Sequence, residues 1–139
     1  MPLSFNEKYD RARPSYVRVN GKRFADLPAG TTILIPSPQD IEAELSRLVP
    51  GEYIGAIELR RRMAQRHGTE GTCPVMTGMN LRIVAERALD QLSAGMSMSD
   101  VAPVWLAIDP TSPLGQKLPG SSARMADLRA EAVRLSPKD

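Results

Sequence analysis

Cysteine and histidine each occur only once in this chain of 139 residues, as Cys73 and His67. A single cysteine excludes a disulfide within the chain, and this pair does not supply the four ligands of a usual zinc site. No apolar run approaches the roughly 18 residues of a membrane span, and the N-terminus lacks the apolar region of a signal peptide. We therefore expect no cofactor, no membrane contact and a cytoplasmic, monomeric protein.

Charge of one sign is also scarce, because the net charge is only +2. An average this small is a weak indication of nucleic-acid binding, but the positive charge is unevenly distributed. It gathers in an N-terminal segment, from Lys8 to Arg23, and again at Arg60, Arg61, Arg62 and Arg66.

Short β segments are expected near the N-terminus. Asn20-Gly21 lies between two β-prone runs, and this pair favours a tight turn, so the sequence predicts a hairpin over about 16–24. A short apolar strand is expected over 32–35, and it should end there because Pro36 follows directly.

The rest of the chain is expected to be mainly helical. Ser37, Pro38 and Asp40 are typical of a helix start, and apolar residues at helical spacing continue to Leu48. Further helices are predicted over 57–67, over 77–93 and over 122–135, with Met125, Leu128, Ala132 and Leu135 as the buried side of the last. Between the last two, "PVWLAI" predicts a strand and "DPTSPLGQKLPG" predicts an extended loop or wing.

These elements predict a mainly α protein with small β elements. Two successive helices followed by a β wing indicate a winged helix-turn-helix with an added N-terminal β hairpin. We expect a basic arm and hairpin over 1–32, the winged helix domain over 33–135 and a tail over 136–139.

Several short motifs, taken in order, resemble one known family. "IPSPQDIEAELSRLVPGEYIGAIELRRRMAQRHG", then "TGMNLRIVAERAL", then "PVWLAIDPTSPLGQKLPGSSARMADLRAEAV" resemble the DNA-binding domain of the alkylguanine-DNA alkyltransferases and their alkyltransferase-like relatives. The matching positions are Pro50, Gly51, Glu52, Glu58, Leu59, Pro103, Leu114, Gly115, Leu128 and Glu131.

The reactive residues of that family are missing. Its Pro-Cys-His-Arg motif falls on Pro103, Val104, Trp105 and Leu106, and its Thr-Tyr pair falls on Gly55 and Ala56. Valine carries no nucleophile, so alkyl transfer to residue 104 is excluded. The sequence therefore favours a protein without enzymatic activity, and "PVWLAI" becomes an apolar wall at the former active-site position.

The resemblance implies a surface for double-stranded DNA and a pocket for a lesion. The recognition helix would present Thr77, Asn80, Arg82 and Arg87, with Arg82 inserted into the duplex from the minor groove. The lesion pocket would be lined by Pro103, Val104, Trp105 and Gly115. Arg60, Arg61, Arg62 and Arg66 would contact phosphates, because arginine binds them with two parallel hydrogen bonds.

Each of these assignments has a plainer alternative. Arg82 and Arg87 can be solvated helix charges, and the arginines at 60–66 can form a solvated face paired with Glu58 and Glu70. Trp105 either stacks on an extruded base or anchors the core. Cys73 is either a structural residue or a replacement nucleophile, and His67 is interpreted as a capping or surface residue.

Three functional hypotheses follow. The first is a nonenzymatic DNA-binding protein of the alkyltransferase-like type, which recognises alkylated guanine in duplex DNA and recruits a repair protein. The second is a protein-interaction module on the same fold that does not bind DNA. The third is an alkyl-accepting enzyme that depends on Cys73.

Overall fold

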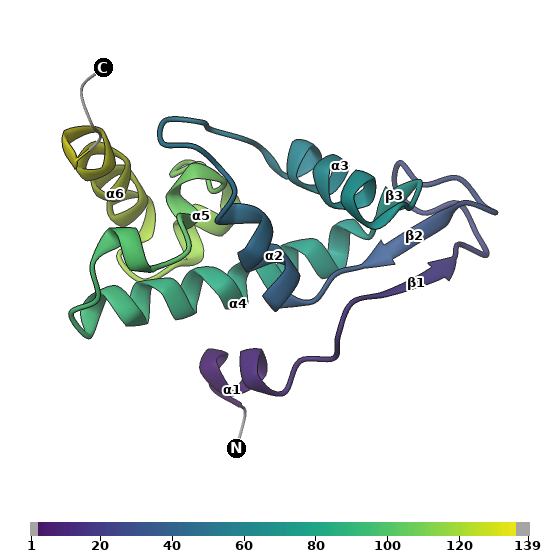
Figure 1. Ribbon diagram of the computed structural model, residues 1–139, viewed down its shortest axis with the longest axis horizontal. Coiled ribbons are helices and arrows are strands. Elements are labelled where there is room, and N and C mark those ends of the chain that lie inside the picture. Colours follow the sequence, from purple (N-terminus) through teal and green to yellow (C-terminus); the bar gives the residue numbers. More distant parts are fainter. Residues whose placement is uncertain (1–2, 136–139) are drawn as a thin grey trace.

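One long helix forms the centre of the molecule. The computed structural model describes residues 3–135, and the tail expected over 136–139 lies outside them. The central helix, α4 (Pro74–Ser93), runs along the length of the structure (Figure 1). Around it lie α1 (Phe5–Asp10), α2 (Pro38–Leu45), α3 (Ala56–His67), the short α5 (Pro113–Lys117) and α6 (Ser121–Leu135). The described part of the chain is therefore mainly helical, as the sequence predicts.

A small three-stranded sheet stands at one end of α4. It contains β1 (Tyr16–Val19), β2 (Thr32–Ile35) and β3 (Gly71–Thr72), in the order β1-β2-β3. β1 is antiparallel to β2, with Tyr16 opposite Ile35, whereas β3 is parallel to β2. The sheet thus joins the N-terminal arm to the helical part across the boundary expected at residue 32.

The prediction of a hairpin turn at Asn20-Gly21 is wrong. β1 pairs with β2 instead, and a tight turn forms further along, where Phe24 and Leu27 exchange backbone hydrogen bonds of 2.9 and 2.8 Å. Asn20 is buried, and its side-chain amide donates to the carbonyl oxygens of Leu27 and Pro28. Asn20 therefore closes the loop from within rather than forming a surface turn.

The helix boundaries follow the capping residues. The Ser37 hydroxyl accepts a hydrogen bond from the Asp40 amide at the start of α2, and Gly68 ends α3 with a φ of 70°. α4 begins at Pro74, earlier than the predicted residue 77, because proline is accepted in the first turn of a helix. α1 was not expected, although "SFNE" contains its capping box: Ser4 and Glu7 bond each other's backbone amides.

Three predictions for the chain after α4 are corrected. "PVWLAI" is not a strand, because Val104–Leu106 form a turn of 3-10 helix (η2), and a second such turn (η1) spans Met98–Asp100. The expected wing contains a helix instead, α5, whose N-cap is Ser112. Leu135 is also not buried, since 62% of it is exposed.

The main core lies where α2, α3, α6 and η2 meet α4. Its fully buried members include Ile41, Leu59, Met63, Val84, Val104 and Met125. Apolar residues of α4 at helical spacing, from Leu81 to Leu89, face this core, and Leu92 packs against it. A second, smaller cluster under the sheet contains Leu27, Ile33, Ile35 and Cys73.

Candidate functional site

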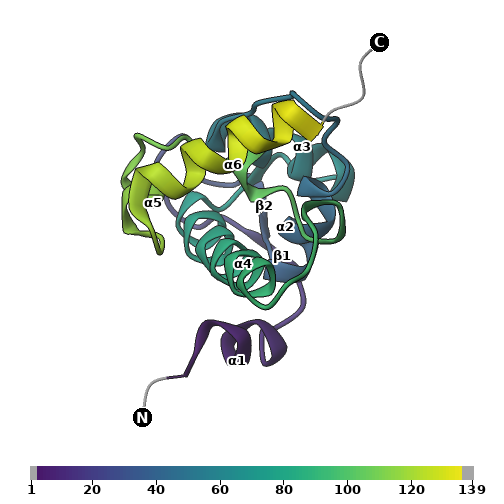
Figure 2. The same cartoon turned by 90° about the vertical axis from the view of Figure 1, so that its left-hand side faces the viewer.

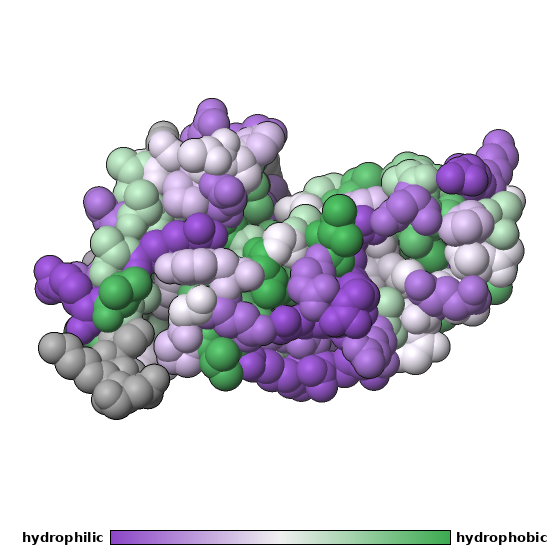
Figure 3. All heavy atoms as spheres, turned by 90° about the horizontal axis from the view of Figure 1, so that it is seen from above, coloured by the Kyte–Doolittle hydropathy of each residue, from purple (hydrophilic) through white to green (hydrophobic). Residues whose placement is uncertain are grey.

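The four arginines of α3 are all engaged with carboxylates of the same chain. Hydrophilic residues gather over α3 in the view from above (Figure 3), but they carry both signs of charge. The pairs are Arg60 with Asp26, Arg61 with Glu58, Arg62 with Glu52 and Glu58, and Arg66 with Glu44. The expected partner Glu70 bonds Thr32 instead. The positive charge of this surface is therefore largely compensated within the molecule.

Glu58 is the centre of this network. Arg61 donates to both of its carboxylate oxygens, at 2.8 and 2.7 Å, and Arg62 donates to Oε1 at 2.9 Å. Hydrogen bonds from Arg61 and then Arg62 lower the pKa of Glu58 to about 2. Arg62 also donates to Glu52 at 2.7 Å, which ties the loop before α3 to the helix.

We expect Glu58→Gln to make the protein less sensitive to acid. The pKa of Glu58 is lower in the folded chain than its ordinary value of 4.5, so its contribution to stability is present above pH 4.5 and is lost as the pH falls towards 2. The measurement is the melting temperature between pH 6 and pH 2. The variant should show a shallower fall over this range, starting from a slightly lower value at pH 6.

The matched control is Asp127→Asn, which removes an exposed carboxylate of α6 that forms no ion pair within residues 3–135. Its melting profile should run parallel to that of the unmodified protein. If the Glu58→Gln profile also runs parallel, the network does not contribute to acid stability.

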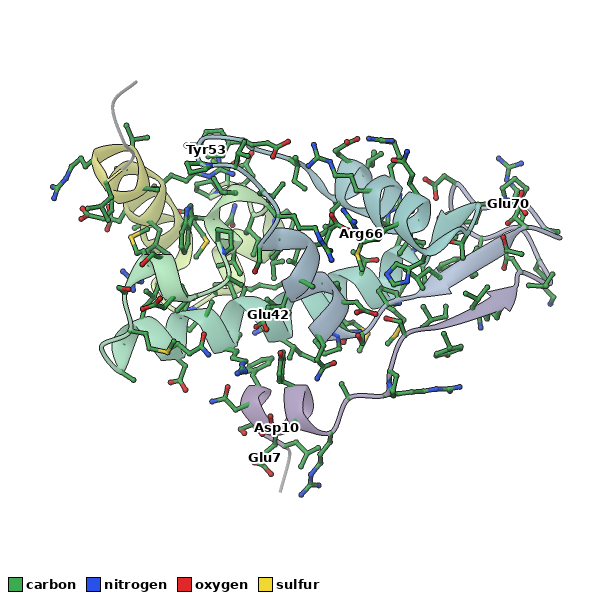
Figure 4. The ribbon with its side chains drawn as sticks, viewed as in Figure 1. Glu7, Asp10, Glu42, Tyr53, Arg66 and Glu70 are labelled. Atoms are coloured by element: carbon green, nitrogen blue, oxygen red, sulfur yellow. The ribbon has the colours of Figure 1, made fainter. Side chains whose placement is uncertain are left out.

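Arg66 connects α3 to α2 through a buried carboxylate. Its guanidinium, labelled in Figure 4, donates to both oxygens of Glu44, at 2.7 and 3.2 Å. The Glu44 side chain is only 4% exposed. A buried carboxylate without a partner is strongly unfavourable, so this pair has a structural role in holding the two helices together.

Thr77 and Asn80 of α4 point into the protein. Thr77 is 1% exposed, and its hydroxyl donates to the Cys73 carbonyl at 2.7 Å. The Asn80 amide donates to the carbonyl of Pro36 at 2.8 Å, which fixes α4 to the chain between β2 and α2. Both side chains therefore serve the fold and do not face solvent.

Arg82 and Arg87 lie on the opposite side of α4, beneath α1. The guanidinium of Arg82 lies 5.3 Å from the centre of the Phe5 ring, and that of Arg87 lies 4.0 Å from the Tyr9 ring. The Nε atoms of both arginines are buried and have no hydrogen-bond partner, and neither residue forms an ion pair within residues 3–135. Stacking on an aromatic ring supplies only part of the interaction energy that a guanidinium gains from water or from an anion.

Glu86 lies between these two arginines in the sequence of α4. Burial raises the pKa of its carboxyl, and the nearby positive charge of Arg82 opposes that change. Its Oε1 atom is also buried and accepts no hydrogen bond from any group within residues 3–135. The surface of α4 under α1 thus contains three polar atoms whose hydrogen bonding is incomplete.

α1 is attached to the rest of the protein by a few polar contacts. The Tyr9 hydroxyl donates to Glu42 at 2.8 Å, Gln39 donates to the Tyr9 carbonyl at 2.6 Å, and Asn6 donates to Asp90 at 2.9 Å. Burial and then the bond to Glu42 raise the pKa of Tyr9 to about 12. None of the residues of α1 is fully buried, so the helix lies on the surface of α4 (Figures 1 and 4).

The expected lesion pocket is present only in part. Pro103 and Trp105 line a cavity of about 520 Å³, which is mainly apolar. Val104 is fully buried in the core, and Gly115 lies away from the cavity, where a Cβ would collide with the backbone oxygens of Asp109 and Pro110. Other residues that line the cavity are Leu48, Pro50, Met98, Val101, Leu106 and Leu135.

Two residues near this cavity, Arg129 and Tyr53, were not predicted from the sequence. Arg129 of α6 donates to the carbonyls of Trp105 and Ile108, at 2.7 and 3.2 Å, and stacks on Tyr53 at 4.3 Å. Arg129 therefore fixes the backbone of η2, whereas the family motif would place an arginine at residue 106. No pattern in the sequence indicates these contacts, because the residues are distant along the chain.

The placement of Cys73 agrees with a structural role, and that of His67 agrees with a surface residue. Cys73 is 5% exposed and packs against Leu27, Ile33 and Ile35, so its thiol is not presented to a substrate. His67 is exposed in the last turn of α3, near the negative end of the helix dipole.

The tertiary structure does not bring the expected residues into one site. α1 and the α4 arginines lie on one side of α4, whereas α6, which borders the cavity at Trp105, lies on the other (Figures 1 and 2). The α3 arginines form a third surface. Any duplex that contacted Arg82 and Arg87 would therefore approach the side away from the cavity.

Comparisons with known proteins give no match to this chain, neither among family models nor among curated proteins nor among solved structures. Within residues 3–135, no three histidine, cysteine or acidic side chains are grouped so that they could hold a metal ion. The helices in this range include none with the length and apolar character needed to cross a membrane.

Proposed function

We propose that this chain is a nonenzymatic protein that binds duplex DNA through the side of α4 that α1 covers. One observation carries the proposal: Arg82 and Arg87 have buried Nε atoms without hydrogen-bond partners and form no ion pair within the described residues. A guanidinium in this condition gains two charge-assisted hydrogen bonds when it meets a phosphate. The proposed contact is thus with the phosphate backbone and is independent of base sequence.

α1 is a displaceable cover in this proposal. Its aromatic rings shield the arginines, and none of its residues is fully buried. Lys8 and Arg11 are exposed at α1 and form no ion pair within residues 3–135. They add positive charge beside Arg82 and Arg87, which favours the approach of DNA.

The finer fold assignment belongs to the same proposal. α3 and α4 are successive helices joined by residues 68–73, as in a helix-turn-helix, and α4 would be the helix that meets the duplex. The alkyltransferase-like family and the recognition of alkylated guanine also remain proposals, supported by the motif order and by the cavity at Pro103 and Trp105. Alkyl transfer is not proposed, because Val104 has no nucleophile.

The test is a fluorescence-anisotropy titration of the protein with two matched duplexes, one unmodified and one containing an alkylated guanine, at two salt concentrations. We expect binding that weakens with salt, with a slope of log K against log salt of about −2 to −4 for two to four phosphate contacts. Equal affinity for both duplexes would support phosphate binding alone. Tighter binding of the alkylated duplex would support lesion recognition as well.

The matched control is Arg61→Gln, because Arg61 is the most exposed arginine of the α3 network and its charge is paired with Glu58. This variant should bind the duplex as the unmodified protein does. Absence of binding even at low salt would overturn the proposal of DNA binding.

A further inference from the structure

β1 leaves one side of the sheet open. It is the first strand in the order β1-β2-β3, and β2 is its only neighbour among the described strands (Figure 1). Val17 and Val19 are 52% and 66% exposed, which is unusual for two β-branched residues of a strand. An open strand edge with exposed apolar side chains is a template for pairing with another chain.

The register shows which backbone groups are free. The amide of Asn20 donates to the carbonyl of Thr31 at 2.8 Å, so the backbone N–H of Asn20 points across to the second strand of the pair. In an antiparallel ladder, successive residues of a strand direct their N–H and C=O groups to alternate sides. Arg18 and Tyr16 therefore bond to β2, whereas the N–H and C=O groups of Val17 and Val19 point towards the open edge.

The charge around this edge is positive. Arg18 lies in the strand, and Lys22 and Arg23 follow it in the loop. All three are exposed, and none forms an ion pair within residues 3–135. A second copy of the chain would bring like charges together at this edge, whereas an acidic segment would neutralise them.

We propose that the open edge of β1 binds an extended acidic segment of a partner protein by strand addition. Backbone groups of Val17 and Val19 form the new ladder, their side chains pack against apolar residues of the segment, and Arg18, Lys22 and Arg23 attract its carboxylates. This inference does not depend on DNA binding, since it uses β1 and its loop rather than α1 and α4.

The first experiment uses a fluorescein-labelled peptide of seven residues that alternates valine with glutamate or aspartate, in anisotropy titrations with the full chain. Two further peptides carry N-methyl groups either on all odd-numbered or on all even-numbered residues. N-methylation removes the amide donor, and alternate amides point to opposite sides of a strand. We expect one methylated peptide to bind at least about tenfold more weakly and the other to bind nearly as well as the parent.

The second experiment uses Val19→Pro, which removes an amide that points away from β2 and so leaves the β1–β2 ladder intact. It should weaken peptide binding about tenfold without changing the melting temperature. If this variant does not fold, the pair Arg18→Glu and Lys22→Glu replaces it, because both side chains are exposed. The charge reversal should abolish binding of the acidic peptide.

Three outcomes would overturn the inference. The first is no binding of the parent peptide, and the second is an equal loss for both methylated peptides. The third is that Val19→Pro or the charge reversal reduces binding of duplex DNA or self-association of the chain but leaves peptide binding unchanged. That result would assign the edge to DNA or to a second copy.

Discussion

Replacing both Arg82 and Arg87 by glutamine is expected to reduce affinity for duplex DNA by about 100-fold at low salt. Each arginine would lose its contact with one phosphate, and the net contribution of such a contact is about 1.5 kcal/mol, or about tenfold in affinity. The slope of log K against log salt should also become less negative by about 2, because two contacts that release counterions are lost. Anisotropy titrations at several salt concentrations measure both effects.

A variant of α1 gives the opposite test. Phe5→Ala with Tyr9→Ala removes the rings that stack on the two arginines, and each stacking contact is worth about 0.5–1 kcal/mol. If α1 competes with DNA, this variant should bind the duplex more tightly, by up to about tenfold. The melting temperature should fall by a few degrees, because the two stacking contacts and the hydrogen bond from Tyr9 to Glu42 are lost. Unchanged binding in both variants would exclude this side of α4 as the DNA surface.

Replacing Trp105 by alanine is expected to lower the free energy of unfolding by about 3–5 kcal/mol. Trp105 is only 4% exposed and belongs to the main core around α4. It also borders the cavity of about 520 Å³, so the truncation would enlarge a space that the core does not fill. Urea unfolding followed by circular dichroism measures the effect, since Trp105 is the only tryptophan and its fluorescence is lost in the variant.

Trp105→Phe separates the two roles considered for this residue. Phenylalanine keeps most of the buried apolar surface, so stability should be lost by a smaller amount than in the alanine variant. A smaller loss of stability than in Trp105→Ala, with unchanged selectivity between alkylated and unmodified duplexes, would support the core role alone. Loss of less than about 1 kcal/mol in Trp105→Ala would contradict that role.

The elements that local chemistry specifies could be predicted from the sequence. Ser37 and Pro38 define the start of α2, Gly68 ends α3, and the apolar stripe of α4 gives its buried face. The strand expected over 32–35 is confirmed as β2. α1 could also have been predicted from its capping residues, because "SFNE" is a capping box that the sequence interpretation overlooked.

The β elements were harder to predict, because their pairing depends on distant residues. Asn20-Gly21 favours a turn locally, but burial of the Asn20 amide against two carbonyls determines the conformation. "PVWLAI" is apolar throughout, and such a run fits a buried strand or a buried helical turn equally well. Among the described residues no strand pairs with this segment, and its backbone is bonded by the local turns of η2, by the Ile54 amide and by Arg129.

The candidate sites show the same division. By itself the sequence determined that residue 104 carries no nucleophile, that no usual zinc site can form, and that the arginines cluster on α3 and occur twice on α4. Only the tertiary structure decided which charges remain available, because an arginine is neutralised by any carboxylate that folding brings near it. Thus Asp26, Glu44 and Glu52 form ion pairs with α3 arginines from distant positions, whereas Arg82 and Arg87 stack on aromatic rings of α1 and form no ion pair within residues 3–135.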